Sequence, residues 1–238
     1  MASEYLKKKY KDVKPDIKRE LTPAEKRKNW WDYHKWHVVT GVVLLLILGS
    51  IVWNALHQIK PDYQIAYVGE YALPDDTAAA LESGLAALGE DLNGDGRVVV
   101  QMVQYASSGG TDPQSVMAAE MKVMADLTAC ESYFFLLEDP EKFQMNYGIL
   151  RKFDGSLPAE TDASGKGEYL AWTQCPALAR MELGEYSYSL MGETVSGSSG
   201  ELVSKLYIAR RGFWGDKTAP YPEGCAALWK KITEGAVS

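Results

Sequence analysis

The longest apolar stretch of the chain runs from residue 38 to residue 56 and contains no charged side chain. At about 1.5 Å of rise per residue, a helix of this length is roughly as long as the hydrocarbon core of a bilayer is thick. Aromatic side chains prefer the membrane–water interface. They flank the stretch at Trp30, Trp31, Tyr33, Trp36 and Trp53. The pattern predicts a single transmembrane helix over 38–56.

A helix start precedes this stretch. Thr22-Pro23-Ala24-Glu25 has the form of a capping box with proline at the first helical position. We therefore expect a helix that begins at about Pro23 and continues into the membrane span. Residues 1–37 are too short and too polar to fold alone, and they predict a basic tail that ends in this juxtamembrane helix.

Beyond residue 60, apolar runs of strand length alternate with segments of helical period. The runs predict strands at Tyr63–Gly69, Arg97–Tyr105 and Ser132–Leu137. Between them we expect a helix over 76–89 with an aspartate cap, and a second helix that Asp112-Pro113 opens. Strands and helices that alternate with short joints predict a parallel sheet with right-handed crossovers. The expected fold class is α/β, a three-layer extracytoplasmic domain over 60–238 with a mainly parallel sheet.

The second of these helices carries a wide apolar stripe that we expect to face the core. Its members are Val116, Met117, Met121, Val123, Met124 and Leu127. The last part of the chain is less regular. Residues 160–168 and 192–201 are rich in polar and small residues and predict loops. Short strands are expected at Tyr169–Trp172 and Tyr186–Leu190, a longer strand at Leu202–Arg210, and a final helix from Pro222.

Charge gives the expected orientation. Residues 1–37 hold 11 Lys and Arg against 6 Asp and Glu, whereas residues 60–238 hold 14 against 26. Because the basic side of a span stays in the cytoplasm, we expect the N-terminus inside and the acidic domain outside. The alternative is a cleaved signal peptide. Its n-region would be unusually long and aromatic, and no A-x-A site follows the span, so an uncleaved signal-anchor is favoured.

The basic tail has two interpretations. Its lysines and arginine at 7, 8, 9, 11, 14, 18 and 19 form a juxtamembrane cluster that would attract anionic lipid by about 1 kcal/mol per residue near the surface. The same residues are sufficient for topology control and solubility. The membrane is thus the first expected partner, and the acidic balance of 60–238 argues against nucleic acid.

The juxtamembrane run Asn29-Trp30-Trp31-Asp32-Tyr33-His34-Lys35-Trp36-His37 carries a first resemblance. It resembles the W-x-Y-x-K-W-H signature of small single-pass membrane-anchored proteins of the Firmicutes, in which one transmembrane helix and a modest outer domain follow. His34 stands where an aromatic residue is more usual. The resemblance implies a topology and no activity.

A second resemblance lies in the outer domain. Met124-Ala125-Asp126-Leu127, followed by Tyr133–Phe143, is similar to a helix and strand of extracellular solute-binding proteins. In those proteins the next segment borders the ligand cleft. The outer domain here is much shorter than a two-lobed binding protein, so the resemblance implies a reduced relative.

One segment has the form of a cation loop. Asp91, Asn93 and Asp95 offer side-chain oxygens, Gly96 follows, and Arg97 offers a backbone carbonyl, an arrangement that suits Ca²⁺. Valine and methionine stand at the ninth and twelfth positions, so a distant carboxylate would have to complete the site, as in sugar-binding periplasmic proteins. The alternative is a tight turn without metal.

The sequence of the outer domain lacks several common combinations of catalytic residues. The three histidines of the chain, His34, His37 and His57, all lie beside the membrane. Their absence beyond residue 57 excludes Ser–His–Asp, Cys–His and His-rich zinc sites there, and no Ser-x-x-Lys occurs. The cysteines are Cys130, Cys175 and Cys225, which leaves open one disulfide with a spare thiol or three buried thiols. Arg210-Arg211, with Phe213 and Trp214, suggests either an anion site or a packed turn.

Ligands of open α/β sheets bind outside the carboxyl ends of the strands. At these ends we expect Tyr71 and Tyr105 as aromatic platforms and Glu138 as an acceptor for a polar or cationic ligand. The favoured function is a membrane-tethered binding or sensing domain that is not an enzyme. A structural or interaction subunit of a cell-envelope complex and a carboxylate-based hydrolase are the alternatives.

Overall fold

The computed structural model describes residues 20–56, 60–107, 109, 112–153, 155–156, 167–190, 193–212 and 217–236. It separates into two compact units, Met1–Ile59 and Lys60–Ser238. The basic cluster of the tail, His57, Phe213 and Trp214 lie outside the described residues.

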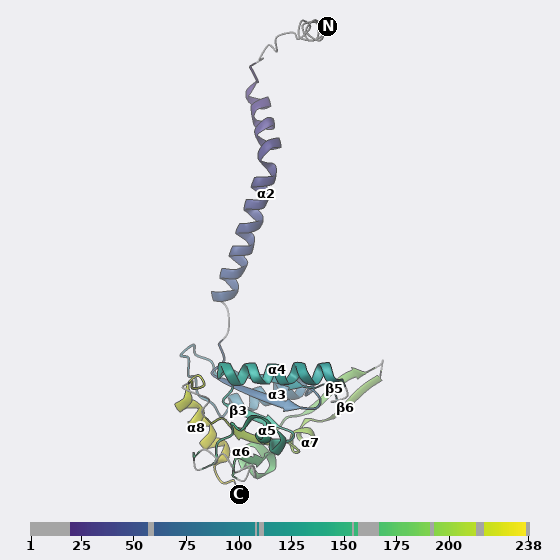
Figure 1. Cartoon of the computed structure of the whole chain (residues 1–238), viewed down its shortest axis with the longest axis vertical. Coiled ribbons are helices and arrows are strands. Elements are labelled where there is room, and N and C mark those ends of the chain that lie inside the picture. Colours follow the sequence, from purple (N-terminus) through teal and green to yellow (C-terminus); the bar gives the residue numbers. More distant parts are fainter. Residues whose placement is uncertain are drawn as a thin grey trace, which may run out of the picture. The chain divides into compact units, whose positions relative to one another are not determined.

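The described part of the first unit contains one long helix, α2, over Pro23–Leu56 (Figure 1). The predicted capping box is present, since Thr22 N donates to Glu25 Oε2 at 2.9 Å and Glu25 N donates to Thr22 Oγ1 at 3.4 Å. Its apolar part lies open, with Leu45 70 % exposed. Within the described residues, α2 is the one helix long and apolar enough to cross a membrane.

A five-stranded sheet forms the centre of the second unit. Its strands are β1 (Tyr63–Gly69), β2 (Val100–Ala106), β3 (Phe134–Leu137), β4 (Tyr169–Ala171) and β7 (Tyr207–Arg210), in the order β2-β1-β3-β7-β4. Strand β1 pairs in parallel with β2 and β3, and β7 is antiparallel to its two neighbours. Four strands therefore point the same way, which confirms a mixed α/β unit with a mostly parallel sheet.

Helices and a hairpin complete this unit. The helices are α3 (Asp75–Ala86), α4 (Pro113–Ala129), α5 (Pro140–Tyr147), η1 (Trp172–Gln174), α6 (Pro176–Ala179), α7 (Ser199–Val203) and α8 (Pro222–Thr233). The hairpin consists of β5 (Glu185–Leu190) and β6 (Glu193–Ser198), and it projects beyond the sheet (Figure 1).

The core consists of two apolar clusters. Successive side chains of a strand point to opposite faces of a sheet. In β1, Ile65 and Tyr67 accordingly belong to one cluster and Ala66 to the other. The first cluster includes side chains of α3, α6, α7 and α8, and the second includes Val123 of α4 and Phe143 of α5.

The methionine stripe differs from the prediction. Val123 and Leu127 are buried, but Met117, Met121 and Met124 are 62 %, 67 % and 44 % exposed. Side chains three or four residues apart share a helix face. The six predicted positions therefore cover two faces, and only one of them packs on the core.

Two boundaries near the C-terminus were wrong. The predicted loop over 192–201 contains β6 and α7, because the backbone of 193–198 pairs with β5 whatever its small side chains. The predicted strand over Leu202–Arg210 begins only at Tyr207, because residues 199–203 form α7, with Ser199 and Val203 buried. The predicted loop over 160–168 lies mostly outside the described residues.

Two other boundaries shift for local reasons. Helix α3 follows Pro74 and has no side-chain cap, and the carboxylate of Asp76 instead accepts a hydrogen bond from Ser187 N at 3.2 Å. Strand β2 begins at Val100 rather than Arg97, because Asp62 Oδ2 accepts the N–H of Val99 at 2.8 Å.

Candidate functional site

A cavity of about 490 Å³ in the second unit lies where β1, β2 and β3 end, between α4 and α5. Its volume lies within the range of small-molecule sites. Its walls include Tyr105 and Ser107 at the end of β2, Val116 and Val123 of α4, and Phe143 and Tyr147 of α5. We call this cavity the cleft.

The capped N-termini of α4 and α5 position the walls of the cleft. Asp112 caps α4 by accepting from the N–H groups of Gln114 and Ser115, both at 3.2 Å. Asp139 caps α5 by accepting from Lys142 N at 2.9 Å. Each helix begins with proline directly after its capping aspartate. These starts fix the two helices on either side of the carboxyl edge of the sheet.

Glu138 lies at this edge and is held by the backbone. Its Oε2 accepts from Glu70 N at 2.5 Å. A Cβ at Gly69 would lie 2.2 Å from the hydroxyl of Tyr67 and 2.9 Å from the same Oε2, so glycine is needed there. Burial, followed by the neighbouring Glu138 carboxylate, raises the pKa of Tyr67.

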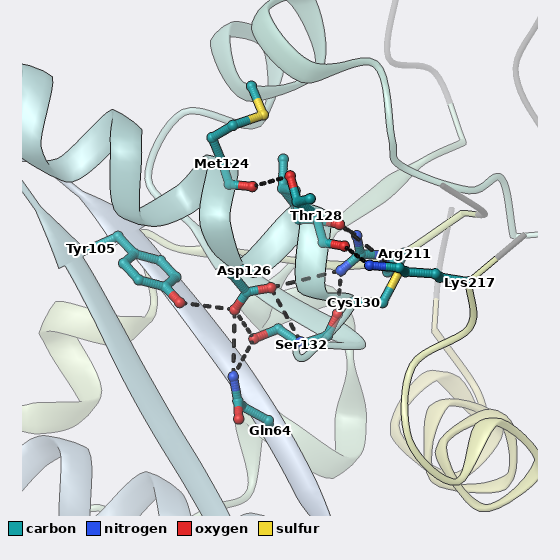
Figure 2. A network of polar contacts seen from close by, with 10 residues as sticks. Gln64, Tyr105, Met124, Asp126, Thr128, Cys130, Ser132, Arg211 and Lys217 are labelled. Carbon is teal, nitrogen blue, oxygen red and sulfur yellow. Dashed lines mark hydrogen bonds and ion pairs between the residues drawn. The ribbon is translucent and has the colours of Figure 1, made fainter. Parts of the chain in front are cut away.

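Tyr105 lines the cleft, and its hydroxyl forms a hydrogen bond inside the protein. The hydroxyl donates to Asp126 Oδ2 at 2.8 Å, and Figure 2 shows it pointing into the network around that carboxylate. Burial, and then the charge of Asp126, raise the pKa of Tyr105 well above its ordinary value. The phenol is therefore neutral and already hydrogen-bonded.

Tyr71 lies beside the cleft rather than in it. It is 63 % exposed, and its ring packs over Gly109, where a Cβ would lie 3.0 Å from the Tyr71 hydroxyl. Of the three residues predicted to bind a ligand, the structure therefore places Tyr105 and Glu138 on one cavity and Tyr71 outside its walls.

Charge in the cleft is strongly acidic. Among the described residues its walls carry four carboxylates, those of Glu70, Glu120, Glu138 and Asp139, against one ammonium group, that of Lys142. Burial, and then the charge of Glu120, raise the pKa of Tyr147. The carboxylate of α4 is thus electrostatically coupled to α5. Glu120 and Tyr147 were not predicted to lie at this site, because the apolar period of a helix does not show which of its other side chains face a cavity.

The predicted cation loop is ordered by its own backbone. Asp91 accepts from Gly94 N at 2.7 Å and from Gly96 N at 2.8 Å, and the second of these bonds is the main reason that the pKa of Asp91 is lowered. Asn93 and Asp95 each accept from the residue two positions on. Arg97 is the donor to Asp95. Within the described part of the chain, no three His, Cys, Asp or Glu side chains are grouped as metal ligands. Calcium binding stays a prediction.

The three cysteines are buried, and the two arginines form contacts within the protein. Cys130, Cys175 and Cys225 are free and buried. Arg210 lies 5.4 Å above the ring of Trp229 and donates to two backbone carbonyls. Arg211 pairs with Asp126 at 3.7 Å. Neither arginine lines the cleft.

Comparison with known proteins adds no relative. No family model matches the chain, and neither a curated protein nor a solved structure matches it.

Proposed function

We propose that this chain is a membrane-tethered binding or sensing domain whose cleft takes a small polar or cationic ligand. In this proposal α2 crosses the cell membrane once with the N-terminus in the cytoplasm. The second unit lies outside, and its helices cover the two faces of the sheet as the outer layers of three. The observation that carries the proposal is the acidic cleft at the carboxyl edge of the parallel strands.

Two carboxylates support a cationic ligand in particular. Glu138 and Asp139 already accept backbone hydrogen bonds, but the exposed carboxylates of Glu70 and Glu120 accept none among the described residues. The rings of Phe143 and Tyr147 add apolar and π surface, which favours an ammonium group over a neutral one.

Binding is favoured over catalysis by the accessibility of the reactive groups. Ser132, whose hydroxyl donates to the carboxylate of Asp126, is fully buried with this partner. The hydroxyl of Tyr105 already donates a hydrogen bond to the same carboxylate. The cleft walls therefore offer groups that hold a charge rather than a nucleophile with its base.

The proposal is tested on the full-length chain in neutral detergent, by thermal unfolding with spermidine, choline or glucose. A ligand that binds the folded state raises the melting temperature in proportion to RT ln(1 + [L]/Kd). We expect an amine to raise it and glucose not to. The Glu70→Gln and Glu120→Gln variants should each lose most of the shift, whereas Glu193→Gln on β6 should keep it. Equal shifts in all variants, or none with any amine, would overturn the proposed site.

A further inference from the structure

Exposed methionines lie on both helices that line the cleft, α4 and α5. On α4 they are Met117, Met121 and Met124, and on α5 Met145 is 73 % exposed. Methionine is flexible and polarizable, and surfaces rich in it adapt to varied apolar partners. Four such side chains on the two helices that line one cavity are more than the scattered apolar residues of an ordinary surface.

The methionines of α4 are continuous with the cleft. The helical neighbours of Glu120, three and four residues away, are Val116, Met117, Val123 and Met124. The two valines line the cleft, and the two methionines are exposed. Glu120 is therefore at the border between the cavity and the methionine face, with its carboxylate available to both.

The same relation holds on α5. Met145 follows Lys142 by three residues, so these side chains are neighbours on the helix surface. Lys142 lines the cleft. The exposed methionines thus adjoin the cleft lining at an acidic residue, Glu120, on α4 and at a basic residue, Lys142, on α5.

We propose that the cleft and its methionine rims form one surface that takes a basic, partly apolar segment of a partner protein. The inference rests on the proposed function, since it assigns the cation in the cleft to a peptide side chain. Lysine or arginine side chains of the segment meet Glu70, Glu120 and the edge carboxylates, while its apolar side chains cover the methionines. This pairing of charge and apolar surface is typical of grooves that hold an amphipathic segment.

The acidic charge of the second unit favours a basic peptide over a second copy of the chain and over anionic lipid. The second unit carries 26 acidic against 14 basic residues, so a second copy would bring a like-charged face to the cleft. Anionic lipid would be repelled for the same reason. A small amine fits the carboxylates but leaves the methionine rims in water.

The experiment uses the full-length chain in phosphatidylcholine discs and a short fluorescein-labelled peptide of alternating Leu and Lys pairs. Binding is followed by fluorescence anisotropy, with empty discs as background. Controls are the same peptide with Glu for Lys and spermidine as competitor. The test variants are Glu120→Gln and the triple change Met117→Gln, Met121→Gln, Met124→Gln. Tyr188→Gln, which removes an exposed ring of the hairpin, is the matched control.

We expect the Lys peptide to bind and the Glu peptide not to. The triple variant should bind at least about tenfold more weakly, because it loses the burial of three methionines. Glu120→Gln should weaken binding several-fold and Tyr188→Gln should leave it unchanged. Spermidine should compete only partly, and light scattering should give the same mass for wild type and triple variant.

Three results would overturn the inference. If the triple variant binds the Lys peptide like wild type while Glu120→Gln weakens both peptide and spermidine, the site holds small cations only and the proposed function stands. If Glu120→Gln affects neither ligand, both proposals fail. If the triple change halves the particle mass, the methionine face belongs to a second copy.

Discussion

At the residue scale, the buried carboxylate of Asp126 joins segments far apart in the sequence. It accepts from Tyr105, Ser132 and Gln64 and lies 3.7 Å from the guanidinium of Arg211 (Figure 2). Tyr105 and Gln64 lie on β2 and β1, Ser132 lies just before β3, and Arg211 directly follows β7. Both side chains of the ion pair are at most 2 % exposed, so neither charge has water as a substitute partner.

We predict that Asp126→Ala destabilises the second unit by about 3–5 kcal/mol, because Arg211 is left buried without its counter-charge. Denaturant unfolding of the full-length chain in detergent measures the change. Replacing both partners, by Asp126→Leu with Arg211→Met, should cost less than the sum of the single changes. Simple additivity would contradict the coupling.

The buried thiols predict how the stability of the folded chain changes with pH. Burial raises the pKa of Cys175 from 9.0 to about 11 and that of Cys225 to about 12. The raised pKa values mean that the folded state favours the neutral thiols. Their contribution to the stability of the folded state is therefore fully present below pH 9.0 and is lost as the pH rises towards the pKa values that the thiols have in the folded state. At pH 8 we expect Ellman's reagent to react with neither thiol until the chain unfolds. Fast labelling of the native chain would contradict their burial.

At the scale of elements, strands β1, β2 and β3 were predictable because their runs are rich in β-branched, aromatic and other apolar residues, and the run of β3 is nearly continuous in apolar character. Tyr105 and Glu138 were predictable as neighbours because parallel strands end at one edge. The position of Glu120 depends on the rotation of α4, which periodicity alone did not fix. Strand β6 was missed because its pairing is made by backbone groups that leave little trace in side-chain type.

The loop after α3 offers a test of its two interpretations. Asp62 accepts from the N–H groups of Leu92, Asn93 and Val99, and Asp91 accepts from two glycines. Asp62→Ala should cost about 2–4 kcal/mol, since three partly buried N–H groups lose their acceptor. If the loop also holds Ca²⁺, millimolar Ca²⁺ should raise the melting temperature of wild type but not of Asp91→Ala. Identical melting with Ca²⁺ and with chelator would leave a turn stabilised by Asp62.

At the scale of the whole molecule, the two units differ in what can stabilise them. The Lys60–Ser238 unit has two apolar clusters of its own, whereas no described part of the apolar stretch of α2 is buried. Such a helix is expected to bury its surface in lipid.

We predict that protease added to wall-stripped cells removes the residues beyond about 60 and spares the N-terminal tail. The basic residues before the span would stay in the cytoplasm, where the protease does not reach them. Antibodies to tags at each end, read by blotting, distinguish the two sides. Protection of the C-terminal tag in intact cells would contradict this topology.

The strand order also constrains when the sheet is completed. Strand β1 pairs with β2 and with β3, and all three lie within residues 63–137, so this part of the sheet can form once that stretch has been made. In the sheet β4 pairs with β7, and β7 is made about forty residues later. During synthesis or export, β4 must therefore wait for the last part of the chain. A chain stalled near residue 200 leaves β3 with an open edge, which is a ready template for aggregation.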